Sequence, residues 1–345
     1  MRWENVHVAG VGVWLAGRTA TAEAVAEGLY DAEEQSATQL TAVCAARAGG
    51  DDDISAPEMA VRAAQVALHR AGAVADDIST VFHSHLWYQG ADLWPAASFV
   101  AGHTVGADVP ALELLQQCNG GLAGVEMAAR ALGEADAALL TTADRFAAPG
   151  FDRWRAERGL VYGDGGTALV LSTRAGFARL RSTATTADNG LEGLARPGGP
   201  GAGPPDDRGP VDLDARSAAF FSSGRGDFRD VVLRTARASQ ASIDRALSDA
   251  GVGRDDVARV VLNATGLPRL AWQLEHQLGI DLKFSNWEFC REVGHLGAGD
   301  HFAGLNELVE TGEVGVGDLV LLVGGGTGYT CTSAVLEITG EQGWL

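Results

Sequence analysis

An internal repeat constrains the fold of this chain more than any other feature of its sequence. Residues 67–82 and residues 246–261 share, in one register, an Ala-Leu pair, an Ala-Gly pair, an Asp-Asp pair and an apolar run. Each copy is typical of an amphipathic helix that stops at the glycine, followed by an Asp-Asp turn and a buried strand. The chain therefore contains the same helix–strand unit twice.

A second repeated unit begins with a glycine-rich sequence in each half of the chain. Cys118-Asn119-Gly120-Gly121 precedes one helical stretch and strand, and His295-Leu296-Gly297-Ala298-Gly299 precedes another. Glycine-rich hairpin signals at residues 163–166 and 324–328 then close the two halves. If a pseudo-twofold axis relates the halves, Cys118 and His295 occupy equivalent helix N-termini, and we expect them to face each other near that axis.

The alternation of helices and strands predicts an α/β protein in which mixed sheets enclose helices. We place the first half at residues 1–175, with Cys118, and the second half at residues 176–345, with His295. A Gly/Pro-rich loop over residues 195–210 cannot hold a helix or a strand. A loop of this length is a functional cover or a disordered linker, and we favour a cover.

The net charge of −19 limits the partners of the protein, because it argues against a nucleic-acid groove or a docking surface for anionic lipid. The first residues lead into a strand-like stretch instead of a signal-peptide core, and no apolar run reaches transmembrane length. Four widely spaced cysteines without a CxxC pair predict neither a disulfide framework nor a zinc site. His83, His85 and His103 also lack a ligand spacing, so no metal is predicted. We expect a cytoplasmic protein with small-molecule partners.

Three stretches of the sequence, in this order and spacing, resemble the ketosynthase III branch of the thiolase superfamily. Residues 114–121 (Leu-Leu-Gln-Gln-Cys-Asn-Gly-Gly) resemble its nucleophile elbow, and residues 162–168 (Tyr-Gly-Asp-Gly-Gly-Thr-Ala) its Gly-Asp-Gly hairpin. Residues 326–330 (Gly-Thr-Gly-Tyr-Thr) resemble its terminal glycine-rich turn. The resemblance runs through nearly the whole chain. It implies a thiolase-like fold with duplicated βαβαβαββ halves in an αβαβα layered arrangement, and a homodimer that pairs through a strand around residues 111–115.

The residues that decide the chemistry depart from the family pattern. Condensing enzymes of the family use a Cys-His-Asn set, whereas here Asn263 stands at the expected histidine and His295 at the expected asparagine. Asp300 follows His295 by about one helical turn and is a candidate partner for its second ring nitrogen. The resulting Cys-His-Asp set resembles that of ketosynthase III homologues in polyketide and glycoside antibiotic pathways that act as O-acyltransferases. Asn263 is then a supporting amide, a substrate contact or a plain strand-end cap.

The resemblance implies a covalent mechanism centred on Cys118. A helix N-terminus and an imidazole both stabilise a thiolate, and Cys118 is predicted to have both. The backbone N–H groups of Cys118 and Thr327, in the turn that begins at Gly326, would bind the oxyanion formed when a thioester is attacked. His295 would then take a proton from an incoming hydroxyl while Asp300 holds its tautomer, and the product is an ester.

The resemblance implies no permanently bound cofactor, but a thioester donor of the malonyl-coenzyme A type or an acyl carrier protein that bears the acyl group. Arg158 matches a family position that contacts the nucleotide end of coenzyme A. It is one of four arginines between Arg145 and Arg158, the best candidate for an anion-contacting face, with solvated surface arginines as the simpler interpretation. The implied acceptor is a hydroxyl of a glycoside or polyketide natural product.

Three other functions stay open at the level of the sequence. A decarboxylative condensing or starter-unit ketosynthase needs two donors on an enolate oxygen, and Asn263 and His295 can both donate. A catalytically degenerate subunit of a partner ketosynthase is disfavoured because Cys118 is retained. An acyl shuttle between carrier proteins would use Cys118 in the same way as the O-acyltransferase.

Overall fold

The computed structural model describes residues 1–133, 136–196 and 210–340 of the chain. Most of the predicted cover, residues 197–209, lies outside the described residues. The main strands are β1 (His7–Leu15), β4 (Ile78–Ser84), β5 (Ala111–Glu113), β6 (Ala137–Asp144), β7 (Gly165–Ser172), β8 (Ala178–Ala187), β9 (Val257–Leu262), β10 (Leu319–Gly326) and β11 (Thr330–Ile338). Strands β2 (Arg18–Ala20) and β3 (Ala42–Cys44) form a separate ribbon.

The helices alternate with these strands along the chain. The α-helices are α1 (Thr21–Ala26), α2 (Ala32–Thr38), α3 (Ala56–Ala71), α4 (Ala96–Gly102), α5 (Gly120–Ala131), α6 (Leu213–Ser222), α7 (Phe228–Ala250), α8 (Leu267–Gln273), α9 (Trp287–Val293) and α10 (Asp300–Glu310). The short turns are η1 (Gly72–Asp77), η2 (Gln117–Asn119), η3 (Asn189–Leu194), η4 (Arg254–Asp256), η6 (Leu282–Phe284) and η7 (Gly297–Gly299), together with the π turn η5 (Leu274–Leu278).

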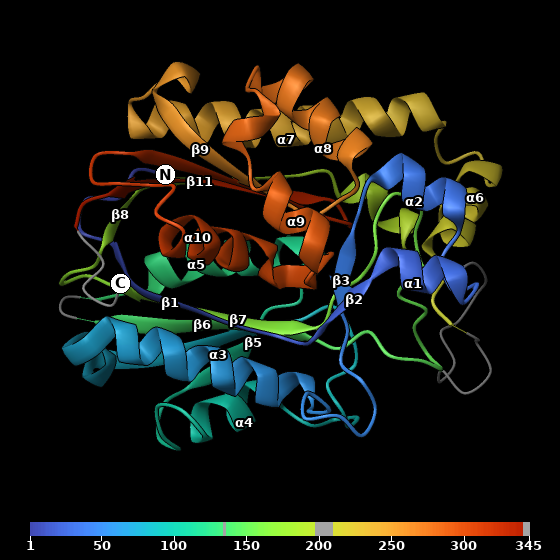
Figure 1. Cartoon of the computed structure of the whole chain (residues 1–345). Helices are drawn as coiled ribbons and strands as arrows, with labels where there is room; N and C mark the ends of the chain where they lie inside the picture. The colour runs from blue at the N-terminus through green and yellow to red at the C-terminus, as the bar shows by residue number, and fades with distance from the viewer. Residues whose placement is uncertain (134–135, 197–209, 341–345) are drawn as a thin grey trace.

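Helices and strands form five layers, as the αβαβα prediction requires. The described strands of the large sheet follow the order β5-β4-β6-β7-β1-β8-β11-β10-β9. Figure 1 shows these strands in two levels, with α3 and α4 outside one, α7 and α8 outside the other, and α5 and α10 between them. The thiolase-like α/β fold predicted from the sequence is therefore confirmed.

The two predicted repeats occupy matching places in this architecture. Helix α3, turn η1 and strand β4 form the first copy, and α7, η4 and β9 form the second. Strand β4 pairs in parallel with β6, and β9 pairs in parallel with β10. Because β1 also pairs with β8, the sheet is continuous across the predicted boundary between residues 175 and 176, and the division into two halves stays a prediction.

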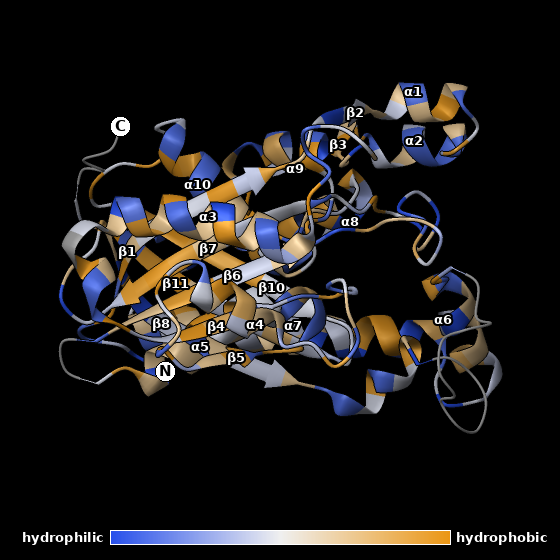
Figure 2. Ribbon diagram, turned by 90° about the horizontal axis from the view of Figure 1, so that it is seen from below, coloured by the Kyte–Doolittle hydropathy of each residue, from blue (hydrophilic) through white to orange (hydrophobic). Residues whose placement is uncertain are grey.

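Burial follows the periodicity that the sequence predicts. The face of α3 that carries Met59, Ala60, Ala63 and Ala67 is buried against the sheet, and Figure 2 shows the opposite side of this helix as largely hydrophilic. The strands of the sheet are mostly hydrophobic in the same view. No helix in the described part of the chain combines the length and apolar character needed to cross a membrane.

The middle layer explains why both repeated units open with glycines. A Cβ atom on Gly121 would lie 2.4 Å from the carbonyl oxygen of Ala298, and one on Gly299 would lie 2.6 Å from Oγ1 of Thr142. Real Cβ atoms do not approach other atoms so closely, because the atoms would overlap. In a close-packed core the neighbours have no room to move away. Gly121 therefore lets the N-terminus of α5 approach the turn before α10, and Gly299 lets that turn lie against β6.

Candidate active site

The first elbow (residues 116–121) holds Cys118 at the N-terminus of α5. Gln117, directly before it, has a φ of +51°, a left-handed conformation that costs a non-glycine residue about 1–2 kcal/mol and is typical of functional sites. The side chain of Cys118 faces His295 of the second half. Cys118 is partly exposed. Its position at a helix N-terminus favours the thiolate.

The other three cysteines are poor candidates for a nucleophile. Cys44, Cys290 and Cys331 are buried, and all four cysteines are free. Burial raises the pKa of Cys44 to about 11 and that of Cys331 to about 12, and it also raises the pKa of Cys290. Their thiols therefore stay protonated at neutral pH.

The second elbow (residues 294–300) presents His295 before α10. The backbone of His295 is fixed by the predicted Gly-Asp-Gly hairpin: its N–H donates to the carbonyl of Val161 (2.7 Å), and its carbonyl accepts from the N–H of Gly163 (2.8 Å). Gly294 has a φ of +74°, and a Cβ there would lie 2.8 Å from the Val161 carbonyl oxygen. A glycine is thus required where the two segments cross.

The structure brings three of the predicted residues together in one chain of hydrogen bonds. Nε2 of His295 lies 2.9 Å from Sγ of Cys118, and Nδ1 of His295 lies 2.6 Å from Oδ2 of Asp300. Only 1% of His295 and 2% of Asp300 is exposed, so this pair is shielded from water. The predicted proximity of Cys118 and His295 is confirmed.

Backbone donors hold Asp300 in this position. Its Oδ1 accepts the N–H of Leu296 (2.7 Å), and its Oδ2 accepts the N–H of Ala264 (2.8 Å) as well as the ring of His295. Burial would raise the pKa of Asp300, but the charge and hydrogen bond of His295 outweigh burial and lower it. Asp300 is therefore a carboxylate at neutral pH.

His295 has a stronger hold on its proton than an ordinary histidine. Burial alone would lower the pKa of His295, but the negative charges of Asp300 and Cys118 and its hydrogen bonds to both outweigh burial. Its pKa is held well above the usual value. This electrostatic pattern suits a thiolate–imidazolium pair before the thiol reacts.

Asn263 lies beside this triad, where the family pattern has its histidine. Its Oδ1 accepts the N–H of Gly325 (3.0 Å), and its Nδ2 lies 3.5 Å from Oδ2 of Asp300. The amide thus contacts Asp300 and the last residues of strand β10. In this position the amide can support the carboxylate of Asp300.

The predicted oxyanion turn packs on the first elbow. A Cβ on Gly326 would lie 2.4 Å from the carbonyl oxygen of Gln116 and 2.9 Å from the N atom of Asn119. The backbone that leads into Thr327 is therefore in van der Waals contact with the residues on both sides of Cys118. Glycine at position 326 is what allows this approach.

Two neighbours of the triad were not predicted from the sequence. Asp144, at the end of β6, is fully buried, and its carboxyl accepts the N–H groups of Leu86 and Trp87 at 2.7–3.0 Å. Burial raises the pKa of Asp144 to about 8. Tyr162 places its ring 5.3 Å from that of His295. Tyr162 lies in a segment that the sequence singles out, whereas nothing marks Asp144 as more than a strand end.

The four arginines between Arg145 and Arg158 do not form one anion-contacting face. Arg153 makes two hydrogen bonds to the buried carboxylate of Asp164 (3.0 and 2.7 Å), and Arg145 pairs with Asp53. Arg158 is 86% exposed and lies near Asp214, with 3.8 Å between its Nε and Oδ2. The structure does not bring Arg158 to the triad.

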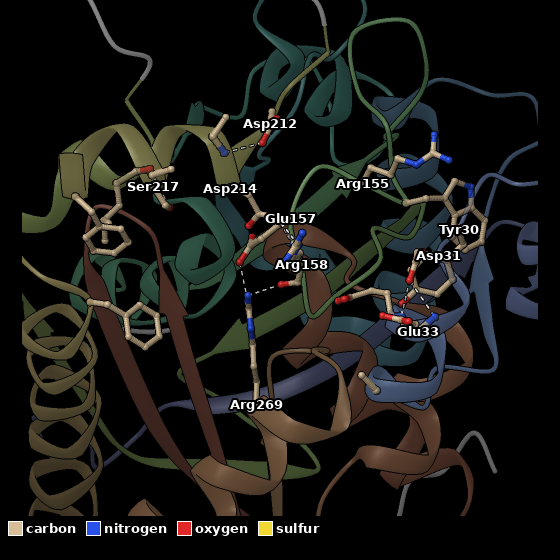
Figure 3. Close-up of a pocket in the computed structure, with 18 of the residues that line it drawn as sticks. Tyr30, Asp31, Glu33, Arg155, Glu157, Arg158, Asp212, Asp214, Ser217 and Arg269 are labelled. Atoms are coloured by element: carbon tan, nitrogen blue, oxygen red, sulfur yellow. Dashed lines mark hydrogen bonds and ion pairs between the residues drawn. The ribbon is translucent and has the colours of Figure 1, made fainter. Parts of the chain in front are cut away.

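Arg158 lines a large cavity of about 1130 Å³ between α2, α6 and α8 (Figure 3). Three arginines and six carboxylic acids line it, and Arg269 pairs with Glu157 at 2.6 Å. Figure 3 shows Arg269 reaching toward Glu157 and Arg158. The cavity is large enough for a drug-sized molecule. The acids are Asp31, Glu33, Glu34, Glu157, Asp212 and Asp214.

The histidines considered for a metal have protein partners instead. His83 contacts Thr141 through Nδ1 (2.9 Å) and Gln89 through Nε2 (3.2 Å). Nδ1 of His85 bonds to the carbonyl of Trp87 (2.9 Å), and that of His103 bonds to the carbonyl of Phe99 (2.8 Å). The described residues contain no group of three His, Cys, Asp or Glu side chains placed to hold a metal ion.

Comparison with known proteins gives matches in sequence and in structure. Residues 247–338 match the family model described as 3-oxoacyl-[acyl-carrier-protein (ACP)] synthase III C terminal. The solved structure of ChlB3, described as an acyltransferase, is 34% identical, with a TM-score of 0.92, and the match covers 99% of this chain and 100% of that one. No curated protein sequence matches.

Two further structures share the fold at lower identity. FabH from Xanthomonas oryzae, a 3-oxoacyl-(acyl carrier protein) synthase III, is 20% identical with a TM-score of 0.77, over 98% of this chain and 100% of that one. The E117Q variant of OleA from Xanthomonas campestris is 18% identical with a TM-score of 0.72, over 98% and 99% of the two chains. These two show a common fold.

Proposed function

The chain belongs to the ketosynthase III-like family of the thiolase superfamily, and from this premise we propose that it transfers an acyl group from a thioester to a hydroxyl through a Cys118 acyl-enzyme. The observation that carries the proposal is the chain of hydrogen bonds from Cys118 through His295 to Asp300. The description of ChlB3 as an acyltransferase agrees with it.

In the first step, the thiolate of Cys118 attacks the carbonyl carbon of the donor thioester. The oxyanion that forms is stabilised by backbone N–H groups, for which those of Cys118 and Thr327 are the proposed donors. The bond to the donor sulfur then breaks, and His295 gives its proton to the leaving thiolate. The result is an acylated Cys118 and a neutral imidazole.

In the second step, His295 takes the proton of an acceptor hydroxyl, which attacks the acyl-enzyme and releases Cys118. Acylation favours this role, because it removes the negative charge of Cys118, one of the influences that raise the pKa of His295. His295 therefore binds its proton less tightly once the acyl group is in place. Asp300 keeps the tautomer with Nε2 free and stabilises the imidazolium that forms.

The place of Asn263 favours transfer over decarboxylative condensation. Condensation needs two donors that converge on the enolate oxygen of a malonyl thioester. The Oδ1 of Asn263 is taken by the N–H of Gly325, and its Nδ2 lies 3.5 Å from Asp300. Both ends of this amide thus have partners in the protein, so it is not free to donate to an enolate oxygen beside His295.

For donor and acceptor we propose a malonyl-type group and a hydroxyl of a glycoside or polyketide natural product. The reason is the sequence resemblance to CerJ, the malonyl transferase of cervimycin biosynthesis. The donor is either coenzyme A or an acyl carrier protein, with no permanently bound cofactor, and Arg158 is the proposed contact for its phosphates. Four free cysteines agree with a reducing, cytoplasmic setting.

We also propose a twofold homodimer that pairs through β5. This short strand forms one edge of the sheet; Leu112 within it is 54% exposed, and Leu115 just after it is 65% exposed. An unpaired edge with exposed apolar side chains is a natural site for pairing with a second copy. Light scattering at micromolar concentration tests this, and a monomer contradicts it.

The acyl-transfer proposal is tested by incubating the protein with malonyl-coenzyme A and measuring its intact mass. We expect an adduct of the complete malonyl group, and peptide mapping should place it on Cys118. Release of carbon dioxide together with an acetyl adduct would instead support condensation. Absence of any adduct with both coenzyme A and carrier-protein donors would contradict the covalent mechanism.

A further inference from the structure

A second, small cavity of about 130 Å³ lies across strand β10 from Cys118. A Cβ on Gly326 would point at the first elbow, whereas one on Gly325 would lie 3.1 Å from the hydroxyl of Tyr329, which lines this cavity. Successive residues of a strand face opposite sides. The other walls come from α7, α8, the π turn η5 and Asn263 at the end of β9. Asn263 therefore lies between the triad and the small cavity.

The small cavity is polar but carries no charge. Among the described residues that line it there is no Asp, Glu, Lys, Arg or His. Burial raises the pKa of Cys331 to about 12 and raises that of Tyr329 above its usual value, so both stay neutral. The large cavity, with its carboxylates and arginines, has the opposite character.

Three side chains of the small cavity are fixed by one another. The hydroxyl of Ser239 donates to Oε1 of Gln277 (3.2 Å), whose Nε2 donates to the carbonyl of Ala236 (3.0 Å). Nε2 of Gln273 lies 3.4 Å from Oγ of Ser239. Gln277 belongs to the π turn η5, which directly follows Gln273, and π turns within helices are frequent at functional sites.

Among the amide and hydroxyl groups of this cavity, two have no hydrogen-bond partner within the described part of the chain. They are Oε1 of Gln273 and the hydroxyl of Tyr329. Neither atom is sealed from solvent, so each can exchange a water molecule for a group of a ligand. An acceptor and a donor are thus available to a bound molecule.

Trp272 forms the outer wall of the cavity. It is 41% exposed, and one face of its ring stacks on His276 with 5.3 Å between the centroids and 12° between the planes. Tryptophan offers a flat apolar surface together with one N–H donor. The cavity therefore combines a planar apolar wall with hydroxyl and amide groups.

We infer that the small cavity binds one neutral, hydroxylated six-membered ring of the acceptor, that is, a pyranose unit of a glycoside. The volume of this cavity is close to that of an apolar cavity on the order of 150 Å³ that admits benzene, so it has room for about one six-membered ring. Amides and hydroxyls can each donate and accept, as sugar hydroxyls require. A malonyl carboxylate would lose its hydration here without a counter-ion, so the acyl group is excluded. The inference rests on the proposed function, because only then is the ring an acceptor.

Binding of simple pyranosides, measured without any acyl donor, tests the inference separately from catalysis. Saturation-transfer NMR on the parent enzyme should show contact with methyl glucopyranoside at millimolar concentration. Cyclohexanol, a ring with a single hydroxyl, and the protonated 2-amino analogue of the glucoside should bind more weakly. Loss of one hydrogen bond in Gln273→Leu should weaken pyranoside binding by about three- to tenfold.

Two variants separate the cavity from general effects on the fold. Gln240→Leu, at a glutamine of α7 whose side chain bonds to Asp244 at the surface, should leave pyranoside binding unchanged. Trp272→Ala, at an exposed position, should weaken binding by about tenfold even if Gln273→Leu folds poorly.

The outcomes distinguish this inference from the proposed function. If the acyl-enzyme forms but no pyranoside binds, or if the charged analogue or cyclohexanol binds as well as the glucoside, the inference is overturned and acyl transfer stands. If pyranoside binding depends on Gln273 and Trp272 but no acyl-enzyme forms with any donor, the sugar site stands and acyl transfer fails.

Discussion

The two elbows at the centre of the molecule occupy equivalent places but treat their functional side chains in opposite ways. The first elbow exposes part of Cys118, after Gln117 in a left-handed conformation. The second elbow buries His295 and Asp300 almost completely and makes its bends with glycines. A nucleophile must be reached by the donor, whereas an imidazole–carboxylate pair gains strength when water is excluded.

Strands β10 and β6, whose ends contact the first and second elbow, also end in different residue types. Strand β10 ends with Gly326, which lets the backbone approach the first elbow, whereas β6 ends with Asp144, whose Oδ2 would lie 2.3 Å from a Cβ on Gly297 of the second elbow. The duplicated halves thus share one backbone arrangement. Different residues at matched positions give the nucleophile to the first half and the imidazole–carboxylate pair to the second.

The largest effect is expected at the first elbow. Cys118→Ala should abolish acyl-enzyme formation and turnover, because the remaining cysteines are buried and their pKa values are raised. Intact-mass measurement after incubation with malonyl-coenzyme A checks this. Substantial acylation in the variant would mean that the first elbow is not the nucleophile site, and Cys331 would become the candidate.

At the second elbow, His295→Ala should slow transfer from the acyl-enzyme by about two to four orders of magnitude, the usual range for a positioned base. Acylation should suffer less, because the N-terminus of α5 still stabilises the thiolate. Single-turnover measurements that time acylation and transfer separately test the division between the elbows. Transfer at the parental rate would show that the second elbow does not supply the base.

Asp300→Asn should slow transfer less than His295→Ala does, because it loosens the tautomer of His295 without removing the base. The charge of Asp300 raises the pKa of His295, so the variant lowers this pKa, and the neutral imidazole appears at lower pH. The loss should therefore be smallest at acid pH. Asp281→Asn, on an exposed turn, is the control. An unchanged pH profile of transfer would contradict the pairing.

The fold and the positions of the two elbows could be predicted from the sequence, because both depend on short sequence patterns. Glycine spacing marks both elbows, and apolar periodicity marks the helices and strands around them. Symmetry between the halves then places Cys118 opposite His295 without coordinates. The pairing of His295 with Asp300 was also accessible, since the two residues lie about one turn apart at the start of a helix.

What was missed depends on contacts between distant segments. Nothing in the sequence around Arg153 shows that it pairs with the buried Asp164 instead of facing an anion. Asp144 resembles any polar residue at a strand end, and its burial results from packing against the second elbow. The small cavity draws its walls from several elements, so no single motif marks it.

Asp144 offers a way to test how tightly the second elbow is packed. Its pKa is raised by burial to about 8, so the folded state keeps a proton that the unfolded chain loses near its ordinary value of 3.8. The stability of the parent should therefore fall as pH rises from about 4 to 8, at up to about 1.4 kcal/mol for each pH unit. Asp144→Asn does not titrate and should flatten this decline. Urea unfolding of the parent and of Asp144→Asn at several pH values tests this. If the free energy of unfolding of both proteins changed with pH in the same way, the raised pKa of Asp144 would be contradicted.

The smallest effect is expected at Asn263, and this small effect decides between two chemistries. In acyl transfer, Asn263 makes no proton transfer, so Asn263→Ala should leave acylation and the maximal transfer rate within about threefold of the parent, the loss of one neutral hydrogen bond. Any larger change should appear in the KM of the acceptor, because Asn263 lines the small cavity. In condensation, by contrast, Asn263 and His295 would both be needed to stabilise the enolate. If Asn263→Ala were as damaged as His295→Ala, and the parent released carbon dioxide from malonyl-coenzyme A, the two elbows would be joint oxyanion donors and the assignment of acyl transfer would fail.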